Sequence, residues 1–225
     1  MRVSCKAERG VATKAVLFDL DGTLVDSAAD IAEALNRTLE ALGHARVSEA
    51  TVRGWIGEGT RHLLATALRH AGDARDPDAV LAPFMAHYRQ CLLRSPVLYP
   101  GVAEALALLR GRGLPLAVCT NKPEAMVAPL LEHLGIAGFF AAIVGGDTLP
   151  RRKPDPAPLL HLAGRFGVAP RECLMVGDSA TDRDAAQAAG MPVVLVRYGY
   201  PRGLDLERAG ALAVLDDLRQ LPALL

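Results

Sequence analysis

The sequence predicts an α/β fold in which helices cover both faces of a parallel sheet and a helical segment is inserted after the first strand. Two observations support this prediction. Short apolar runs alternate with Ala- and Leu-rich segments of helical period along most of the chain, and one long stretch after the first run contains helical segments only. A chain of 225 residues, 51% of them apolar, suits one large domain or a core with an insert.

The predicted strands are five short apolar runs, each of which stops at glycine or polar residues. They cover residues 15–20, 114–119, 141–144, 173–176 and 192–196. The core segments with helical period cover residues 102–110, 124–134, 156–166 and 180–189. Because strands that alternate with helices form βαβ units, we expect a parallel sheet with helices on both of its faces.

The stretch between the first two strands shows no convincing strand. Its helical segments cover residues 28–42, 59–71 and 78–93. The first of these has an apolar stripe at 3- and 4-residue spacings, as expected for a helix that packs on one side. We therefore predict a core formed by residues 14–26 and 96–225 and a helical domain formed by residues 27–95.

Composition excludes several classes of function. The chain has 25 basic and 25 acidic side chains and only 4% aromatic residues, so it lacks the surplus of cations and the stacking surfaces that nucleic acids require. The four cysteines show no CxxC spacing and are expected to be small buried residues. No apolar run is long enough to span a membrane, and charges interrupt the amino-terminal segment. We therefore expect a cytoplasmic protein without nucleic-acid or membrane partners.

Polar residues concentrate where the predicted strands end. They are Asp19 and Asp21 after the first strand, Thr120 and Asn121 after the second, Lys153 in the loop after the third, and Asp178 and Asp182 after the fourth. Ligands of open parallel sheets bind beyond the carboxyl ends of the strands. We therefore expect these side chains to face one ligand.

Carboxylates that converge in this way repel one another unless a cation lies between them. Asp19 and Asp21 share a side in strand geometry, and oxygen ligands of this kind suit Mg²⁺ together with a phosphate. Ordinary alternatives exist, since Asp182 or Thr120 could cap a helix and Lys153 could belong to a solvated loop. No glycine-rich phosphate loop is present, which disfavours nucleotide binding.

Four segments resemble the four motifs of the haloacid dehalogenase-like hydrolase superfamily in residue type, order and spacing. They are DLDGTLVDS at residues 19–27, CTN at 119–121, RKPDP at 152–156 and GDSATD at 177–182. Further segments are similar to the phosphoglycolate phosphatase family, namely WIGEGTRHLL at 55–64, YPGV at 99–102, VGGDTLPRRKPDPAPLLH at 144–161 and AAGMPVVLVRYGY at 188–200. The resemblance implies a Rossmann-like core with a helical cap, and it leaves residues 1–13 as a flexible extension.

The resemblance also implies hydrolysis of a phosphomonoester through an aspartyl-phosphate intermediate. Asp19 would attack phosphorus, and Asp21 would protonate the leaving alkoxide and then activate the water that cleaves the intermediate. Mg²⁺ would be held by a carboxylate oxygen of Asp19, the backbone carbonyl of Asp21 and Asp178. The implied substrate is 2-phosphoglycolate, a small phosphorylated metabolite, which would yield glycolate and phosphate.

The remaining motif residues are implied to surround the phosphoryl group. Thr120, Asn121 and Lys153 would bind phosphate oxygens. Asp182 would orient Lys153 or a water on the metal, and Thr23 would help to shape the first motif loop.

The inserted helices are implied to close over the site and to contact the leaving group. The residues singled out there for substrate selection are Gly57, Glu58, Gly59 and Arg61. The glycine-flanked turn could offer backbone N–H groups, and Arg61 could either pair with a substrate carboxylate or be a solvated helix residue.

The four motifs handle only the phosphoryl group, so they leave the substrate open. A phosphatase or phosphomutase for another small phosphorylated sugar or acid is one alternative. A phosphoryl-accepting signalling domain is a more remote one, because the acidic pair lies on the first strand and the helical insert follows it. The expected assembly is a monomer or a small homo-oligomer.

Overall fold

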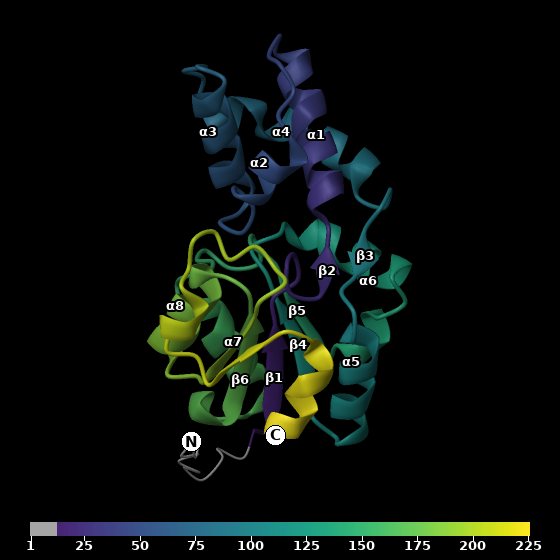
Figure 1. Ribbon diagram of the computed structural model, residues 1–225, viewed down its shortest axis with the longest axis vertical. Helices are drawn as coiled ribbons and strands as arrows, with labels where there is room; N and C mark the ends of the chain where they lie inside the picture. The colour runs from purple at the N-terminus through teal and green to yellow at the C-terminus, as the bar shows by residue number, and fades with distance from the viewer. Residues whose placement is uncertain (1–12) are drawn as a thin grey trace, which may run out of the picture.

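The computed structural model describes residues 13–225 and contains a six-stranded sheet with a group of helices beyond one end of it (Figure 1). The strands are β1 (Ala15–Phe18), β4 (Leu116–Cys119), β5 (Ala142–Val144), β6 (Cys173–Gly177), β7 (Val193–Val196) and β8 (Ala213–Leu215). They lie in the order β5-β4-β1-β6-β7-β8, and every neighbouring pair is parallel. The predicted α/β class with a parallel sheet is confirmed. The extension predicted for residues 1–13 lies, except for residue 13, outside the described residues.

β1 lies in the middle of the sheet and is buried on both faces. It pairs with β4 on one side and with β6 on the other. Because side chains alternate along a strand, Val16 and Phe18 belong to one apolar cluster and Ala15 and Leu17 to another. This double burial explains why the sequence of the strand is a continuous apolar run.

Helices cover both faces of the sheet, as the alternation predicts. α5 (Val102–Gly111), α6 (Val127–His133) and the 3₁₀ helix Leu218–Leu224 bury apolar side chains on one face. α7 (Ala157–Phe166) and α8 (Ala180–Ala189) cover the opposite face. The carboxyl ends of the strands stay uncovered by these helices and face the inserted segment (Figure 1).

The inserted segment contains four helices in the described chain. They are α1 (Ala28–Ala41), α2 (Glu49–Arg53), α3 (Thr60–His70) and α4 (Pro77–Cys91), and α4 packs against both α1 and α3. The chain enters through β2 (Val25–Asp26) and returns through β3 (Val97–Leu98), which form an antiparallel pair. Asp30, at the start of α1, accepts hydrogen bonds from the backbone N–H and the hydroxyl of Ser95 at 3.1 and 2.7 Å. The two connections are therefore tied to each other.

Two smaller expectations concern the cysteines and membrane-spanning helices, and four short elements were not expected. Cys91, Cys119 and Cys173 are buried and unpaired, as predicted, whereas Cys5 lies outside the described residues. Within residues 13–225, no helix has the length and apolarity that crossing a bilayer requires. The short elements β2, β3, α2 and β8 are additions that the sequence patterns did not indicate.

Candidate active site

A small cavity of about 40 Å³ lies at the carboxyl end of β1, between the sheet and the inserted helices. Most of its polar lining comes from the residues that follow β1 and β4, namely Asp19, Asp21, Thr120, Asn121 and Lys122, and Thr60 and Tyr88 of the inserted helices also line it. Its apolar lining comes from the inserted helices and includes Ile31, Leu63 and Phe84. The cavity therefore has a charged floor and an apolar roof.

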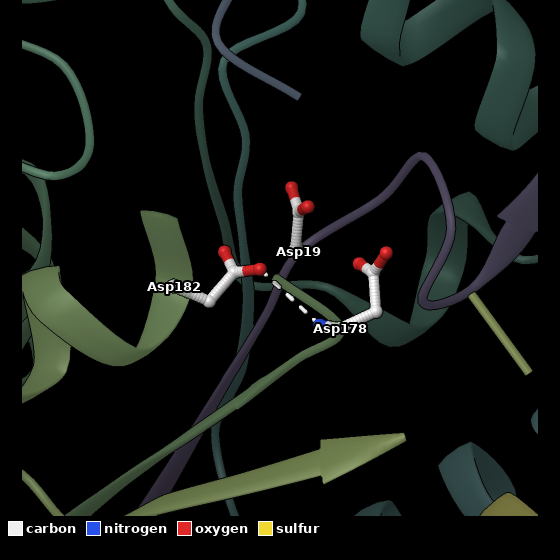
Figure 2. A group of neighbouring side chains, drawn as sticks. All are labelled: Asp19, Asp178 and Asp182. Atoms are coloured by element: carbon white, nitrogen blue, oxygen red, sulfur yellow. Dashed lines mark hydrogen bonds between the residues drawn. The ribbon is translucent and has the colours of Figure 1, made fainter. Parts of the chain in front are cut away.

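Three buried carboxylates meet beside this cavity (Figure 2). Asp19 follows β1, Asp178 follows β6, and Asp182 lies in the first turn of α8. One oxygen of each lies within 4.8 Å of the others. The Lys153 ammonium is 2.9 Å from Asp19 Oδ1 and 2.7 Å from Asp182 Oδ1. The structure thus brings together four of the polar side chains that the sequence places after separate strands.

Burial dominates the electrostatics of this cluster. Desolvation raises the pKa of Asp19 to about 6, although the Lys153 ammonium acts in the opposite direction. Desolvation also raises the pKa of Asp178 well above its usual range, and the carboxylates of Asp182 and Asp19 add to that shift. Burial opposes the charged form of Lys153, but Asp182 and Asp19 outweigh it and raise the pKa of the ammonium.

The Asp178 carboxylate is held in place from two sides. The Thr23 hydroxyl donates to Oδ1 at 2.8 Å, and the backbone N–H of Tyr200 donates to Oδ2 at 2.6 Å. Gly22 lies against the same carboxylate with a φ of +96°, and a Cβ there would contact both Asp178 Oδ2 and the Tyr200 ring. The turn between β1 and β2 can therefore approach Asp178 only because residue 22 is glycine.

The Asp182 carboxylate is fully engaged by the protein. Its Oδ2 accepts from the backbone N–H and the hydroxyl of Ser179, at 3.1 and 2.6 Å, and from the backbone N–H of Asp178 at 3.2 Å (Figure 2). Its Oδ1 accepts from Lys153. Asp182 therefore fixes the start of α8 in a reciprocal capping arrangement and orients the Lys153 ammonium.

The cluster fits a hard divalent cation. Three buried carboxylates share one ammonium, so negative charge is left uncompensated in a site where a charge needs a partner. Asp19 Oδ1 has no aligned hydrogen-bond donor among residues 13–225, although the Lys153 ammonium lies near it. Oxygen donors of this kind suit Mg²⁺. Asp19 and Asp178 are the two acids best placed to hold it, because Asp182 accepts four hydrogen bonds, whereas each oxygen of Asp178 accepts only one from residues 13–225.

The candidate phosphate-binding residues lie in different surroundings. Thr120 is buried at the cavity, where its Oγ1 accepts from the Lys122 backbone N–H at 3.1 Å. Asn121 uses its amide group to donate to the carbonyls of Gly57 and Lys153, at 3.0 and 2.8 Å, and its buried Oδ1 has no partner in the described chain. Lys153 belongs to the carboxylate cluster rather than to the cavity lining.

Asp21 has a partner that the sequence patterns did not single out. The Lys122 ammonium lies 2.9 and 3.2 Å from its two carboxylate oxygens, and the Ser27 hydroxyl donates to Oδ1 at 2.6 Å. Lys122 also donates to the hydroxyl of Tyr88 in α4. Burial opposes its charged form, but Asp21 and Tyr88 outweigh this and raise the pKa of the ammonium. The sequence feature that could have pointed to Lys122 is its position directly after the Thr120-Asn121 pair, at the end of a buried strand.

The residues singled out in the insert separate into two groups. Gly57 and Gly59 line the cavity. Glu58 turns away and forms an ion pair with Arg202 at 2.7 Å. Arg61 is 53% exposed and lies 2.8 Å from Asp78, and it does not line the cavity that contains Asp19 and Asp21.

Comparison with known proteins agrees with these features. Residues 13–190 match the model of the haloacid dehalogenase-like hydrolases. A phosphoglycolate phosphatase from Rhodospirillum rubrum is 49% identical over 215 residues, which cover 92% of this chain and 89% of the relative. One from Pseudomonas putida is 44% identical over 217 residues, which cover 94% of this chain and 79% of the relative. Among solved structures, a predicted phosphoglycolate phosphatase from Haemophilus somnus matches with a TM-score of 0.88 at 36% identity, covering 94% of this chain and 97% of its own.

The chain therefore belongs to the haloacid dehalogenase-like hydrolases, and within them to the family of the phosphoglycolate phosphatases. The family membership expected from the motifs is confirmed, and the protein is an enzyme of the hydrolase class.

Proposed function

We propose that the enzyme hydrolyses 2-phosphoglycolate to glycolate and phosphate through an aspartyl-phosphate on Asp19. The observation that carries the proposal is the position of Asp19, which lies at once in the cavity lining and in the buried carboxylate cluster, 2.9 Å from the Lys153 ammonium. The names of the relatives support the choice of substrate. A small cavity that is bounded by apolar side chains of the inserted helices also suits a small ester.

Asp19 is the nucleophile in this proposal. Its carboxylate oxygen forms a bond to phosphorus while the bond from phosphorus to the ester oxygen breaks. Lys153 lies beside the same carboxylate and can neutralise charge on the phosphoryl oxygens. Thr120, which lines the cavity, offers a hydroxyl to those oxygens. Asn121 is proposed for the same role, in which its amide would donate to a phosphate oxygen in place of the Gly57 or Lys153 carbonyl.

Asp21 moves the protons. It lines the same cavity two residues after Asp19, where it can give a proton to the leaving alkoxide. It then takes a proton from the water that attacks the phosphorus of the intermediate, which releases phosphate and restores Asp19. Ser27 and Lys122 fix the orientation of its carboxylate.

Asp19, the backbone carbonyl of Asp21 and Asp178 would hold Mg²⁺. When bound, the ion supplies positive charge that screens Asp19 from the dianionic ester and stabilises the transferring phosphoryl group. Thr23, Gly22 and Tyr200 keep Asp178 in position for this role. Asp182 orients Lys153 and does not itself bind the ion.

Residues 27–95 are proposed to form a cap over the core of residues 14–26 and 96–225. The cap contributes the apolar roof of the cavity, so closure excludes bulk water from the phosphoryl group. We further propose that the enzyme acts in the cytoplasm, as a monomer or a small homo-oligomer.

The test is phosphate release from a panel of small phosphomonoesters, measured with Mg²⁺ and again with EDTA. A preference for 2-phosphoglycolate that EDTA abolishes is expected. Metal-dependent hydrolysis with a preference for another ester would keep the chemistry and reject the substrate. Asp19→Asn removes the nucleophile at nearly constant volume and should abolish turnover, so appreciable activity in this variant would reject the covalent route.

A further inference from the structure

Lys122 is the cation at the cavity wall, and the proposed reaction gives it no contact with the substrate. We infer that Lys122 binds the carboxylate of the substrate and so makes the enzyme select a phosphorylated acid over a neutral phosphate ester. This inference rests on the proposed function, and the experiment below separates the failure of one from the failure of the other.

Lys122 is held firmly between the core and the inserted helices. Its backbone N–H donates to Thr120 Oγ1 at 3.1 Å, and its carbonyl accepts from the backbone N–H of Gly146 at 2.7 Å. Its side chain is 1% exposed, and its ammonium lies 2.9 Å from Asp21 Oδ1 and 4.8 Å from the centre of the Tyr88 ring. The ammonium therefore has a fixed position at the junction of floor and roof.

The ammonium can turn one donor toward a ligand. An ammonium has three N–H groups, and its acceptors are the two carboxylate oxygens of Asp21, at 2.9 and 3.2 Å, and the Tyr88 hydroxyl. No further acceptor within residues 13–225 contacts the Lys122 Nζ. Because one N–H is enough to hold the Asp21 carboxylate, the N–H of the longer contact can serve a ligand in the cavity that Lys122 lines.

A carboxylate inside this cavity needs such a donor. The cavity is small and its roof is apolar, and an unpaired carboxylate is costly in surroundings of that kind. Lys122 is the only cationic side chain that lines the cavity within the described part of the chain. Lys153 is engaged by Asp19 and Asp182 in the neighbouring cluster. Arg61 is paired with Asp78 on the surface.

The position of Lys122 also matches the dimensions of the substrate. Asp21 is proposed to contact the ester oxygen, and the carboxylate of 2-phosphoglycolate is one methylene group away from that oxygen. The Lys122 ammonium is a direct neighbour of Asp21. A two-carbon phosphorylated acid therefore places its carboxylate beside Lys122 when its ester oxygen is beside Asp21.

The test compares 2-phosphoglycolate with 2-hydroxyethyl phosphate, in which a neutral CH₂OH replaces the carboxylate. The readout is the ratio of kcat/KM for the two esters, because any effect of Lys122 on Asp21 lowers both values and cancels. In Lys122→Gln we expect this ratio to fall about 10- to 100-fold, as for the loss of one charge-assisted hydrogen bond. The matched control is Lys14→Gln, which removes a surface lysine that pairs with Glu172, and it should leave the ratio unchanged.

A second pair of variants covers the case in which the unpaired Asp21 prevents Lys122→Gln from folding. Asp21→Asn and Asp21→Asn/Lys122→Gln differ only in Lys122 and leave no carboxylate at position 21. Calorimetric titration with Mg²⁺ present should show about 10- to 100-fold weaker binding of 2-phosphoglycolate to the double variant than to the single one. Binding of 2-hydroxyethyl phosphate should be equal in the two.

The outcomes distinguish the two proposals. If the wild-type enzyme does not prefer 2-phosphoglycolate to 2-hydroxyethyl phosphate, the proposed substrate is wrong and the inference falls with it. If the wild-type preference is present and persists in Lys122→Gln, only the inference is wrong. If instead Arg61→Gln removes the preference for 2-phosphoglycolate, Arg61 of the inserted helices binds the substrate carboxylate, and the inference is again overturned.

Discussion

Asp19 illustrates how a single buried charge affects folding. Burial raises its pKa from 3.8 to about 6, so the folded state keeps a proton that the unfolded chain releases. Ionisation therefore lowers the free energy of unfolding as the pH rises from 3.8 to about 6, by about 3 kcal/mol for a shift of this size. We predict that Asp19→Asn raises the free energy of unfolding of the metal-free protein at pH 7 by an amount of that order, as measured by urea denaturation in EDTA.

The pH dependence of the difference between wild type and Asp19→Asn is the control. The stability gap should be full above pH 6 and should close toward pH 4, where Asp19 is protonated in the folded wild type. Mg²⁺ should narrow the gap at pH 7, because it binds the folded wild type more tightly than the variant. A gap that stays constant between about pH 4 and pH 7 would contradict the assignment to the Asp19 charge.

Asp182 should matter more for stability than any exposed acid on the same helix. It is completely buried, caps α8 and pairs with Lys153, so Asp182→Asn leaves the ammonium with one carboxylate fewer. We predict a loss of about 3–5 kcal/mol in the free energy of unfolding, as for a broken buried ion pair. Asp184→Asn is the matched control, because this side chain is 46% exposed and, within residues 13–225, pairs only with its neighbour Arg183. Its effect should stay within about 0.5 kcal/mol in the same denaturation experiment.

Single residues also show where sequence patterns stop being informative. Asp19, Asp178 and Lys153 could be singled out because each follows a recognisable strand, and parallel strands end at one edge. Lys122 was not singled out, although it follows the Thr120-Asn121 pair directly, because its burial depends on Tyr88 from a distant helix. The role suggested for Arg61 stays a prediction. The position of Arg61 in the sequence does not reveal that its side chain lies 2.8 Å from Asp78.

At the scale of elements, the turn between β1 and β2 sets the shape of the carboxylate cluster. In Gly22→Ala the new methyl group meets Asp178 and Tyr200, and the positive φ of 96° adds backbone strain. Gly43→Ala is the matched control, since its φ is +86° and, apart from residues 42–44, no atom of the described chain lies within 4 Å of the added Cβ. We predict that Gly22→Ala costs about 1–3 kcal/mol more than Gly43→Ala in thermal or urea denaturation. It should also raise the Mg²⁺ concentration needed for half-maximal activity, whereas equal costs in the two variants would contradict the close approach.

The elements differ in how far the sequence predicts them. α8 and the strands beside β1 agree with prediction because burial on both faces imposes a continuous apolar run. β2 and β3 contain two residues each. They form because the two connections between the insert and the core lie side by side, and no pattern of neighbouring residues in the sequence indicates this contact. α2 is too short for a helical period to be visible. β8 is an edge strand of three residues that pairs with β7, and a run this short gives no recognisable apolar pattern in the sequence.

At the scale of the whole molecule, several polar links join the inserted helices to the core. One is the ion pair of Arg53 with Asp26 at 2.8 Å, and three others contact the turn at residues 57–59 or Tyr88. Asn121 donates to the Gly57 carbonyl, and the Lys122 ammonium contacts Tyr88. Arg202 forms an ion pair with Glu58 and donates to the Thr181 hydroxyl at 3.0 Å. The links of Asn121 and Lys122 involve residues of the cavity lining, whereas Arg202 lies outside it. The Arg202 link can therefore be removed without replacing a residue of the cavity lining.

Arg202→Met should loosen the contact between the two parts of the molecule. An ion pair with one partner half-exposed contributes up to about 1 kcal/mol, so we predict that amide hydrogen exchange of residues 57–59 rises by up to about fivefold. Arg197→Met is the matched control, because Arg197 pairs with Glu207 and Asp216 of the core and makes no link to the insert. Exchange of the 57–59 turn should be unchanged in that variant. If Arg202→Met leaves the exchange of this turn as in the wild type, the Arg202 ion pair does not restrain the turn, and the other links, those of Asn121, Lys122 and Arg53 among them, hold the inserted helices against the core.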